Sequence, residues 1–219
     1  CSGPAAKART TLGISGRQDD ERLRNASLLT EPTAAAGSVY TGVLYDALDL
    51  ATLSAAAKKR AASDIAIASA LFGLLRVTDA IPAYRLSADT ALPGVGKLAG
   101  VWREPVSAAI ADAAGRGVVL DLRSSAYVAL GPVPVELGER TAVARVLQQR
   151  GSKRVVVSHH NKATKGRIVR ALLGQPRPRT VPDLVGSLHK VGYTVEVQAP
   201  AKVGSPWTLD IIEIGRAHV

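Results

Sequence analysis

The chain has 219 residues, 47% of them hydrophobic and 21% charged, which allows one large or two small globular domains. It carries 28 lysines and arginines against 18 aspartates and glutamates, a formal charge of +10 that attracts polyanions. One cysteine, Cys1, excludes a disulfide framework, and no segment approaches the ~20 apolar residues of a membrane helix. We therefore expect a cytoplasmic protein without membrane association.

The two ends of the chain differ from the rest. Residues 1–11 are small and polar without hydrophobic periodicity, and the chain starts at Cys1 and contains no methionine. We expect this stretch to be disordered or a non-native start. Residues 213–219 resemble a translated sequencing adapter, so we expect an artefactual tail. These features predict an N-terminally truncated fragment.

Residues 12–38 predict a small helical hairpin-like element followed by a linker. Leu12-Gly13-Ile14-Ser15 predicts a turn that opens a charged helix over 16–25, with Ser15 as its cap. The small and polar residues of 31–38 predict the linker. Hydrophobic residues at helical spacing then predict a helix over 39–53, followed by a short basic helix over 55–62.

The middle of the chain predicts a strand over 65–69, a helical turn over 71–75 and a long helix over 98–114. Residues 118–122 form a near-continuous apolar run, which is typical of a strand covered on both faces. We expect this strand and the one around 155–157 to lie in the interior of the sheet.

The last part of the chain alternates strands and helices. The predicted segments are strands over 141–147, 154–157, 193–197 and 207–212, and helices over 162–173 and 181–191. This alternation predicts an α/β domain over 39–212, with a mixed β-sheet flanked by helices. A small helix-hairpin-helix-like element precedes it.

The sequence contains none of the common nucleotide-binding, metalloprotease or serine-hydrolase motifs. His159 and His160 are adjacent, so on a strand they would point to opposite faces, and no further ligands accompany them. We expect a polar loop edge at these histidines, and neither a metal nor a cofactor.

The segment 161–167 has the strongest features of a binding site. It follows a predicted strand and opens a predicted helix, where backbone N–H groups and the helix dipole favour an anion. At about 100° per residue, Lys162 and Lys165 fall on the apolar side of this helix, whereas Arg167 and Arg170 point to solvent. We expect the two lysines to contact phosphate.

Two further segments carry candidate residues. Arg123 and Ser124 follow the strand over 118–122, at the edge where α/β sheets bind ligands, although Ser124 could equally cap the next helix. Arg76 and Arg85 flank a loop that contains Asp79. These charges either pair with one another or line a cleft.

Several segments, in order along the chain, resemble the YaaA family of peroxide-stress proteins. The longest runs from Ser69 to Leu86 and is similar to the family's S-G-L-Y-G-x-L-R-P-x-D-x-I-x-P-Y-R-L signature. The other matching segments are Val39-Tyr40-Thr41-Gly42, Leu98 with Trp102, Leu122 to Tyr127, and Lys162 with Lys165 and Gly166. The family's first strand, which ends in S-P-A-K or P-P-S-E-x-K, has no counterpart here.

The resemblance implies a cytosolic protein that is induced by hydrogen peroxide, lowers free intracellular iron and limits oxidative DNA damage. It also implies DNA binding through a basic cleft and a helix-hairpin-helix element, with Gly13 and Ser15 in the hairpin. The scarcity of aromatic residues, 4%, favours contacts to the duplex backbone over base stacking. The predicted phosphate-binding set is Gly13, Ser15, Arg76, Arg85, Arg123, Ser124, Lys162 and Lys165.

An alternative function stays open at this point. Ser124, Lys162 and Arg85 could instead line a pocket at the strand ends, in an enzyme that acts on a small phosphorylated or nucleotide-like ligand. A compact pocket would favour the enzyme, and a broad basic groove would favour DNA.

Overall fold

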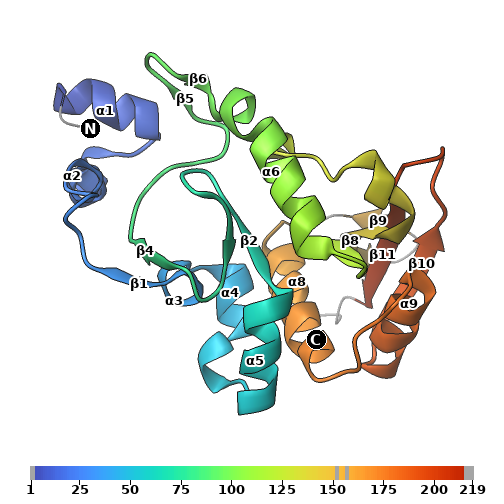
Figure 1. Cartoon of the computed structure of the whole chain (residues 1–219). Coiled ribbons are helices and arrows are strands. Elements are labelled where there is room, and N and C mark those ends of the chain that lie inside the picture. The colour runs from blue at the N-terminus through green and yellow to red at the C-terminus, as the bar shows by residue number, and fades with distance from the viewer. Residues whose placement is uncertain (1–2, 151–152, 156–157, 215–219) are drawn as a thin grey trace. The chain divides into compact units, whose positions relative to one another are not determined.

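In the computed structural model of the chain, residues 3–150, 153–155 and 158–214 are described. Figure 1 labels their helices and strands, which divide into two compact units, each assembled from three segments of the chain. Unit 1 comprises Cys1–Tyr40, Asp64–Ile110 and Arg123–Pro132, and unit 2 comprises Thr41–Ser63, Ala111–Leu122 and Val133–Val219. The segment predicted as one domain, 39–212, contributes to both units.

Unit 2 contains the mixed sheet that the sequence predicted, which has five strands among the described residues. Its strands are β7 (Val119–Asp121), β8 (Thr141–Arg150), β9 (Lys153–Val155), β10 (Thr194–Gln198) and β11 (Trp207–Ile214). β8 pairs in parallel with both β7 and β11, whereas β10 is antiparallel to β11 and β9 is antiparallel to β8. The strand order is β10-β11-β8-β7, with β9 paired to β8 alone.

The core of unit 2 lies between the sheet and two helices, α8 (Ser158–Leu173) and α9 (Val181–Lys190). Because strand side chains alternate, Ala142, Ala144 and Val146 of β8 are buried in this core while Arg145 lies on the opposite face. The alanines are small, so the helices can approach the sheet closely. The other buried members of the core are Ile168, Val181, Leu184, Leu188, Leu209 and Ile211.

The remaining elements of unit 2 are α4 (Val43–Leu48), η2 (Leu50–Thr52), α5 (Ala55–Asp64), the end of α6 (Leu98–Ala114) and η3 (Val135–Arg140). α8 packs against α4 at Gly166, which is buried. A Cβ added at Gly166 would lie 2.1 Å from the Leu44 carbonyl oxygen and 2.9 Å from the Ala47 Cβ. Only glycine therefore fits at this helix crossing.

Arginines from one element close the C-terminal ends of helices in another. Arg170 Nη1 of α8 donates to the carbonyl oxygens of Leu48 and Asp49 at the end of α4, at 2.9 and 2.7 Å. Arg60 Nη1 of α5 donates to the Leu173 carbonyl at the end of α8, at 3.0 Å. The last carbonyls of a helix lack intrahelical partners, so these contacts satisfy groups that would otherwise need water.

Unit 1 contains short elements around a small core. They are α1 (Ala5–Leu12), η1 (Gly16–Gln18), α2 (Asp19–Ala26), α3 (Ala36–Val39), the first part of α6, α7 (Ser125–Ala129) and the antiparallel pairs β1–β4 (Thr33–Ala35, Ala80–Pro82), β2–β3 (Ala66–Ser69, Gly73–Arg76) and β5–β6 (Ala91–Leu92, Gly96–Lys97). Ala70, Ala88, Leu98 and Leu130 form the core, with Trp102 packed against it. Trp102 Nε1 donates to the Ala70 carbonyl at 2.9 Å.

The structure corrects two predictions for the N-terminal part. Residues 5–11 of the stretch expected to be disordered or a non-native start lie in α1, because Leu12 and Ile14 are buried and dock the helix even though its own sequence has little apolar periodicity. The expected linker over 31–38 instead contains β1 and most of α3. β1 pairs with the distant β4 and α1 packs on α2, so tertiary contacts outweigh weak local preferences in both cases.

The helical turn expected over 71–75 is wrong, since Gly73 begins β3 with a left-handed φ of 78°. Ser69 Oγ accepts hydrogen bonds from the N–H groups of Leu71 and Phe72, at 3.3 and 3.0 Å, and so closes a turn between β2 and β3. Short apolar runs do not distinguish a helical turn from a hairpin.

The helices expected over 98–114 and 181–191 are confirmed by α6 and α9, but the interior position expected for the strand over 118–122 is wrong. Of the strand expected around 155–157, only Val155 lies among the described residues. In the described part of the chain β7 and β9 each pair with β8 only, and Val155 is 37% exposed. An apolar run indicates that both faces of a strand are covered, but it does not indicate how many strands pair with that strand. Residues 156 and 157 lie outside the described residues, as do 215–219 of the expected tail, whereas Glu213 and Ile214 continue β11.

The Gly166 crossing leads to the first prediction. Replacing Gly166 with Ala should lower the free energy of unfolding by about 2 kcal/mol or more, because the new methyl group would collide with the α4 backbone. Gly186→Ala on α9 is the matched control, since nothing lies within 4 Å of a Cβ there. That change should stabilise by about 0.5–1 kcal/mol. Urea denaturation of both variants measures the difference, and equal stabilities would contradict the packing described.

Candidate nucleic-acid interface

The eight predicted phosphate-binding residues divide between the two units. Unit 2 contains Lys162 and Lys165. The other six belong to unit 1, and they are Gly13, Ser15, Arg76, Arg85, Arg123 and Ser124.

The predicted hairpin joins α1 to η1 and α2. Gly13 adopts a left-handed conformation, with φ 63° and ψ 38°, which glycine tolerates without strain. The N–H groups of Gly13 and Ile14 donate back to the Thr10 and Arg9 carbonyls, at 3.3 and 3.1 Å, and end the helix. Leu12 and Ile14 are buried, whereas Gly13 and Ser15 are exposed. The turn therefore presents its polar main chain outward.

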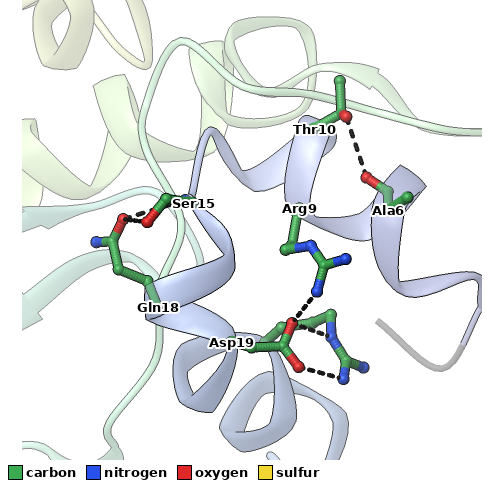
Figure 2. Close-up of polar contacts among 7 residues, drawn as sticks. Ala6, Arg9, Thr10, Ser15, Gln18 and Asp19 are labelled. Carbon is green, nitrogen blue, oxygen red and sulfur yellow. Dashed lines mark hydrogen bonds and ion pairs between the residues drawn. The ribbon is translucent and has the colours of Figure 1, made fainter.

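Ser15 begins the second half of the hairpin, as the sequence predicted. It forms a capping box with Gln18, whose side-chain oxygen accepts the Ser15 N–H at 3.2 Å (Figure 2). A Cβ placed on Gly13 or on Gly16 would meet nothing within 4 Å, so the main chain there is open to an approaching ligand. Arg17 follows at once and is exposed.

Asp19 clamps the two helices together. Its carboxylate accepts from Arg9 Nη1 of α1 at 2.9 Å and from Arg22 of α2 at 2.9 and 2.8 Å (Figure 2). The hydrogen bond from Arg22 lowers the pKa of Asp19 to about 2, with a further contribution from Arg9 against the opposing effect of desolvation. This clamp was not predicted from the sequence, although an aspartate three residues before an arginine is a spacing that favours an ion pair within a helix.

Arg76 and Arg85 differ in their surroundings. Arg76 is half-buried at the end of β3, and its N–H donates to the Asp79 carboxylate at 2.8 Å. The side chain of Arg85 is exposed, while its backbone pairs with Asn25 of α2 through two hydrogen bonds of 2.7 and 2.9 Å. Of the two arginines, Arg85 is the one with a side chain open to a ligand.

Arg123 and Ser124 both precede the short helix α7, and the Arg123 side chain reaches the far end of that helix. Arg123 Nη1 donates to the Gly131 carbonyl at 2.8 Å, just beyond the C-terminus of α7. Ser124 occupies the N-cap position and is exposed, but its hydroxyl makes no capping hydrogen bond to the described residues. Arg123 therefore has a structural role, and Ser124 stays open as a ligand contact.

Three hydroxyl groups form a chain in unit 1 that the sequence analysis did not find. The Tyr84 hydroxyl lies 2.7 Å from both the Ser69 and the Tyr40 hydroxyls. The Tyr84 ring makes edge-to-face contacts with the rings of Tyr40 and Phe72. Burial raises the pKa of the nearby Tyr127 phenol, and Tyr84 adds to this effect. Tyr84, the tyrosine of the segment Tyr84-Arg85-Leu86 that resembles the family signature, therefore has a structural role.

The position expected for Lys162 and Lys165 at a helix start is wrong. α8 begins at Ser158, so Asn161 lies inside the helix, His159 and His160 fall in its first turn, and the lysines follow it. The polar run before Lys162 has no apolar periodicity to indicate that it is helical.

Within α8, Lys162 is exposed and Lys165 is half-buried. Lys165 Nζ donates to the Leu122 carbonyl at 2.9 Å, just after β7. Burial lowers the pKa of the Lys165 ammonium group, and the Asp121 carboxylate opposes this shift. Arg170, expected in solvent, instead caps α4 as described above. Only Lys162 of this segment's lysines presents its full charge to solvent.

Among residues 3–150, 153–155 and 158–214, no group of three or more His, Cys, Asp or Glu side chains is arranged to hold a metal ion. No helix in that part of the chain is long and apolar enough to cross a bilayer.

Comparisons with known proteins agree with the motifs quoted from the sequence. The family model described as "Peroxide stress protein YaaA" matches residues 3–199. A UPF0246 protein of Streptomyces coelicolor is 51% identical over 213 residues, covering 97% of this chain and 81% of that protein. UPF0246 proteins of Corynebacterium glutamicum and Corynebacterium efficiens are 42% and 41% identical, covering 87% and 89% of this chain and 76% and 78% of theirs.

The Asp19 clamp predicts a pH dependence. The folded pKa is lowered from 3.8 to about 2, so the clamp stabilises fully above pH 4 and is lost as the pH falls toward 2. The difference in unfolding free energy between the parent and Asp19→Asn should therefore be constant above pH 4 and shrink below it. Denaturant titrations from pH 2.5 to 7 measure this, with Asp20→Asn as the neighbouring control. A difference that stays constant to pH 2.5 would contradict the clamp.

Proposed function

The chain belongs to the YaaA family of peroxide stress proteins, and we propose that it binds duplex DNA without sequence specificity through the α1–α2 hairpin. The observation that carries the proposal is the exposed, left-handed Gly13 turn between two short clamped helices. The N–H groups of Gly13, Ile14 and Ser15 already donate within the hairpin, so a phosphate would meet the start of η1, at Gly16 and Arg17. Because Gly13 and Gly16 have no side chains, a phosphate can reach the main chain.

Cationic side chains beside the hairpin support the proposal. Arg9 and Arg22 are held by Asp19, and Arg24 lies 4.0 Å from Glu21. Lys7 and Arg17 are exposed and form no ion pair with any residue that the structure describes. These two charges are therefore the ones free to neutralise phosphates next to the turn. The sequence analysis did not select either of them, although Arg17 directly follows Ser15-Gly16.

The protein's net charge of +10 supports binding that does not depend on base sequence. Contacts between cations and phosphates supply most of the free energy of non-specific binding, and they attract DNA at long range. A protein that covers the duplex backbone would limit oxidative damage to DNA, which is the effect expected from the family resemblance. Lowering of free intracellular iron remains part of the proposal. Whole-cell measurement of chelatable iron with and without the gene tests it.

An enzyme acting on a small phosphorylated ligand is the second candidate. Lys165 favours it, because a half-buried ammonium group at the carboxyl end of the parallel strand β7 lies where α/β sheets bind ligands. However, that ammonium group already donates to the Leu122 carbonyl. The DNA-binding proposal is better supported, since its cations are exposed.

Hairpin variants test the proposal directly. Each phosphate contact contributes about 0.9 to the slope of log K against log salt on duplex DNA. Lys7→Ala and Arg17→Ala should each flatten that slope by about this amount, measured by fluorescence anisotropy at several salt concentrations. Arg103→Ala is the matched control, since Arg103 is exposed on α6 of the same unit. No salt-dependent binding by the parent protein would refute the proposed function.

The two lysines of α8 can be separated in the same assay. Lys162→Ala should flatten the salt slope, since Lys162 belongs to the predicted phosphate-binding set, unlike the control Arg103, and its side chain is exposed. Lys165→Ala should change it much less, because its ammonium group donates to the Leu122 carbonyl. Equal losses for the two variants would show that Lys165 leaves this carbonyl to contact DNA.

A further inference from the structure

Asn25 connects α2 to a loop that is distant in the sequence. Its Nδ2 donates to the Arg85 carbonyl at 2.7 Å, and its Oδ1 accepts the Arg85 N–H at 2.9 Å. One carboxamide thus satisfies both backbone groups of a single residue, as a neighbouring strand would. The main chain at residue 85 is therefore fixed relative to the last turn of α2.

The neighbouring Tyr84 is anchored from the other side. Ser69 is fully buried, and its Oγ accepts the N–H groups of Leu71 and Phe72. Its two acceptor positions are filled, so its hydroxyl proton is left for Tyr84, whose hydroxyl oxygen also lies 2.7 Å from that of Tyr40. Residues 84 and 85 belong to no helix or strand, yet they are held by Ser69 on one side and Asn25 on the other.

The side chain of Arg85 takes no part in the hydrogen bonds that hold residues 84 and 85. It is exposed, and it forms no ion pair with the described residues. A fixed backbone with an exposed guanidinium group is the arrangement that binds an anion at a low cost in conformational entropy.

The hairpin and Arg85 lie at opposite ends of α2. Asp19 and Asn25 are six residues apart, which is roughly 9 Å along a helix at 1.5 Å per residue. Phosphates of one DNA strand recur about every 3.4 Å along the duplex axis. A duplex lying along α2 would therefore present different phosphates to the hairpin and to Arg85.

We propose that Asn25 is a positioning residue, which holds Arg85 as a second phosphate contact separate from the hairpin. This inference rests on the DNA-binding function proposed above. Asn25 would be an uncharged member of the interface. It would act on DNA binding through the Arg85 backbone that it holds.

A double-mutant cycle tests the inference, with anisotropy titrations of a labelled duplex over a salt series. Arg85→Ala should flatten the salt slope by about 0.9 and weaken binding about fivefold to tenfold at 0.1 M salt. Asn25→Ala should weaken binding in the parent but leave it unchanged in the Arg85→Ala background. Arg85→Lys should retain the slope, since it keeps the charge, and Arg103→Ala should leave slope and affinity close to those of the parent.

Other outcomes overturn the inference. An unchanged slope in Arg85→Ala, or equal weakening by Asn25→Ala in both backgrounds, would do so. So would a slope loss in Asn25→Ala well above 0.9, because that would mean the hairpin contact is lost as well. If Asn25→Ala does not fold, Asn25→Ser takes its place in the cycle, since it removes the paired hydrogen bonds to Arg85 without adding a charge. Failure of the parent to bind DNA would instead refute the proposed function.

Discussion

The ends of helices set a constraint on this protein, because the last carbonyl groups of each helix need hydrogen-bond donors. Arginines from other elements provide them for α4 and α8, through Arg170 and Arg60. Arg123 does the same beyond α7, within unit 1. Each contact places a cation at the negative end of a helix dipole, which is favourable in addition to the hydrogen bonds.

This use of arginine changes the meaning of the net charge. A formal charge of +10 suggests a surface open to polyanions, but a capping guanidinium group is directed at a carbonyl and is held by it. In unit 1, the cations that remain exposed include Lys7, Arg17 and Arg85. The proposed interface of this unit depends on these exposed residues and on the backbone of the hairpin.

The hairpin itself is rigid for its size. Two helices of eight residues each would be marginal in isolation. The Asp19 carboxylate joins them, the Ser15–Gln18 capping box orders the turn, and Leu12 and Ile14 are buried beneath it. A preordered turn would bind phosphate without first paying the entropy of ordering, which is why this element suits a binding role.

The sequence by itself determined those elements whose hydrophobic pattern matches one regular structure. α6, α9 and β11 were predicted close to their observed bounds, and the α/β class followed from the alternation of such segments. The family resemblance selected Gly13, Arg85 and Lys165 as candidate phosphate contacts, but it did not indicate which residues surround them. Local patterns failed at α1 and at β3, where distant contacts or a single left-handed glycine decide the structure.

Only the tertiary structure decided what each polar side chain does. Arg170 was expected in solvent, yet it bonds to Leu48, 122 residues away in the chain. Arg85 and Asn25 are 60 residues apart, and nothing in either local sequence indicates that they meet. Hydrophobic periodicity assigns a residue to a face of its own helix, because the face is shared with the residues three and four positions away in the sequence. The partner on that face comes from another segment, so it is fixed only when the chain has folded.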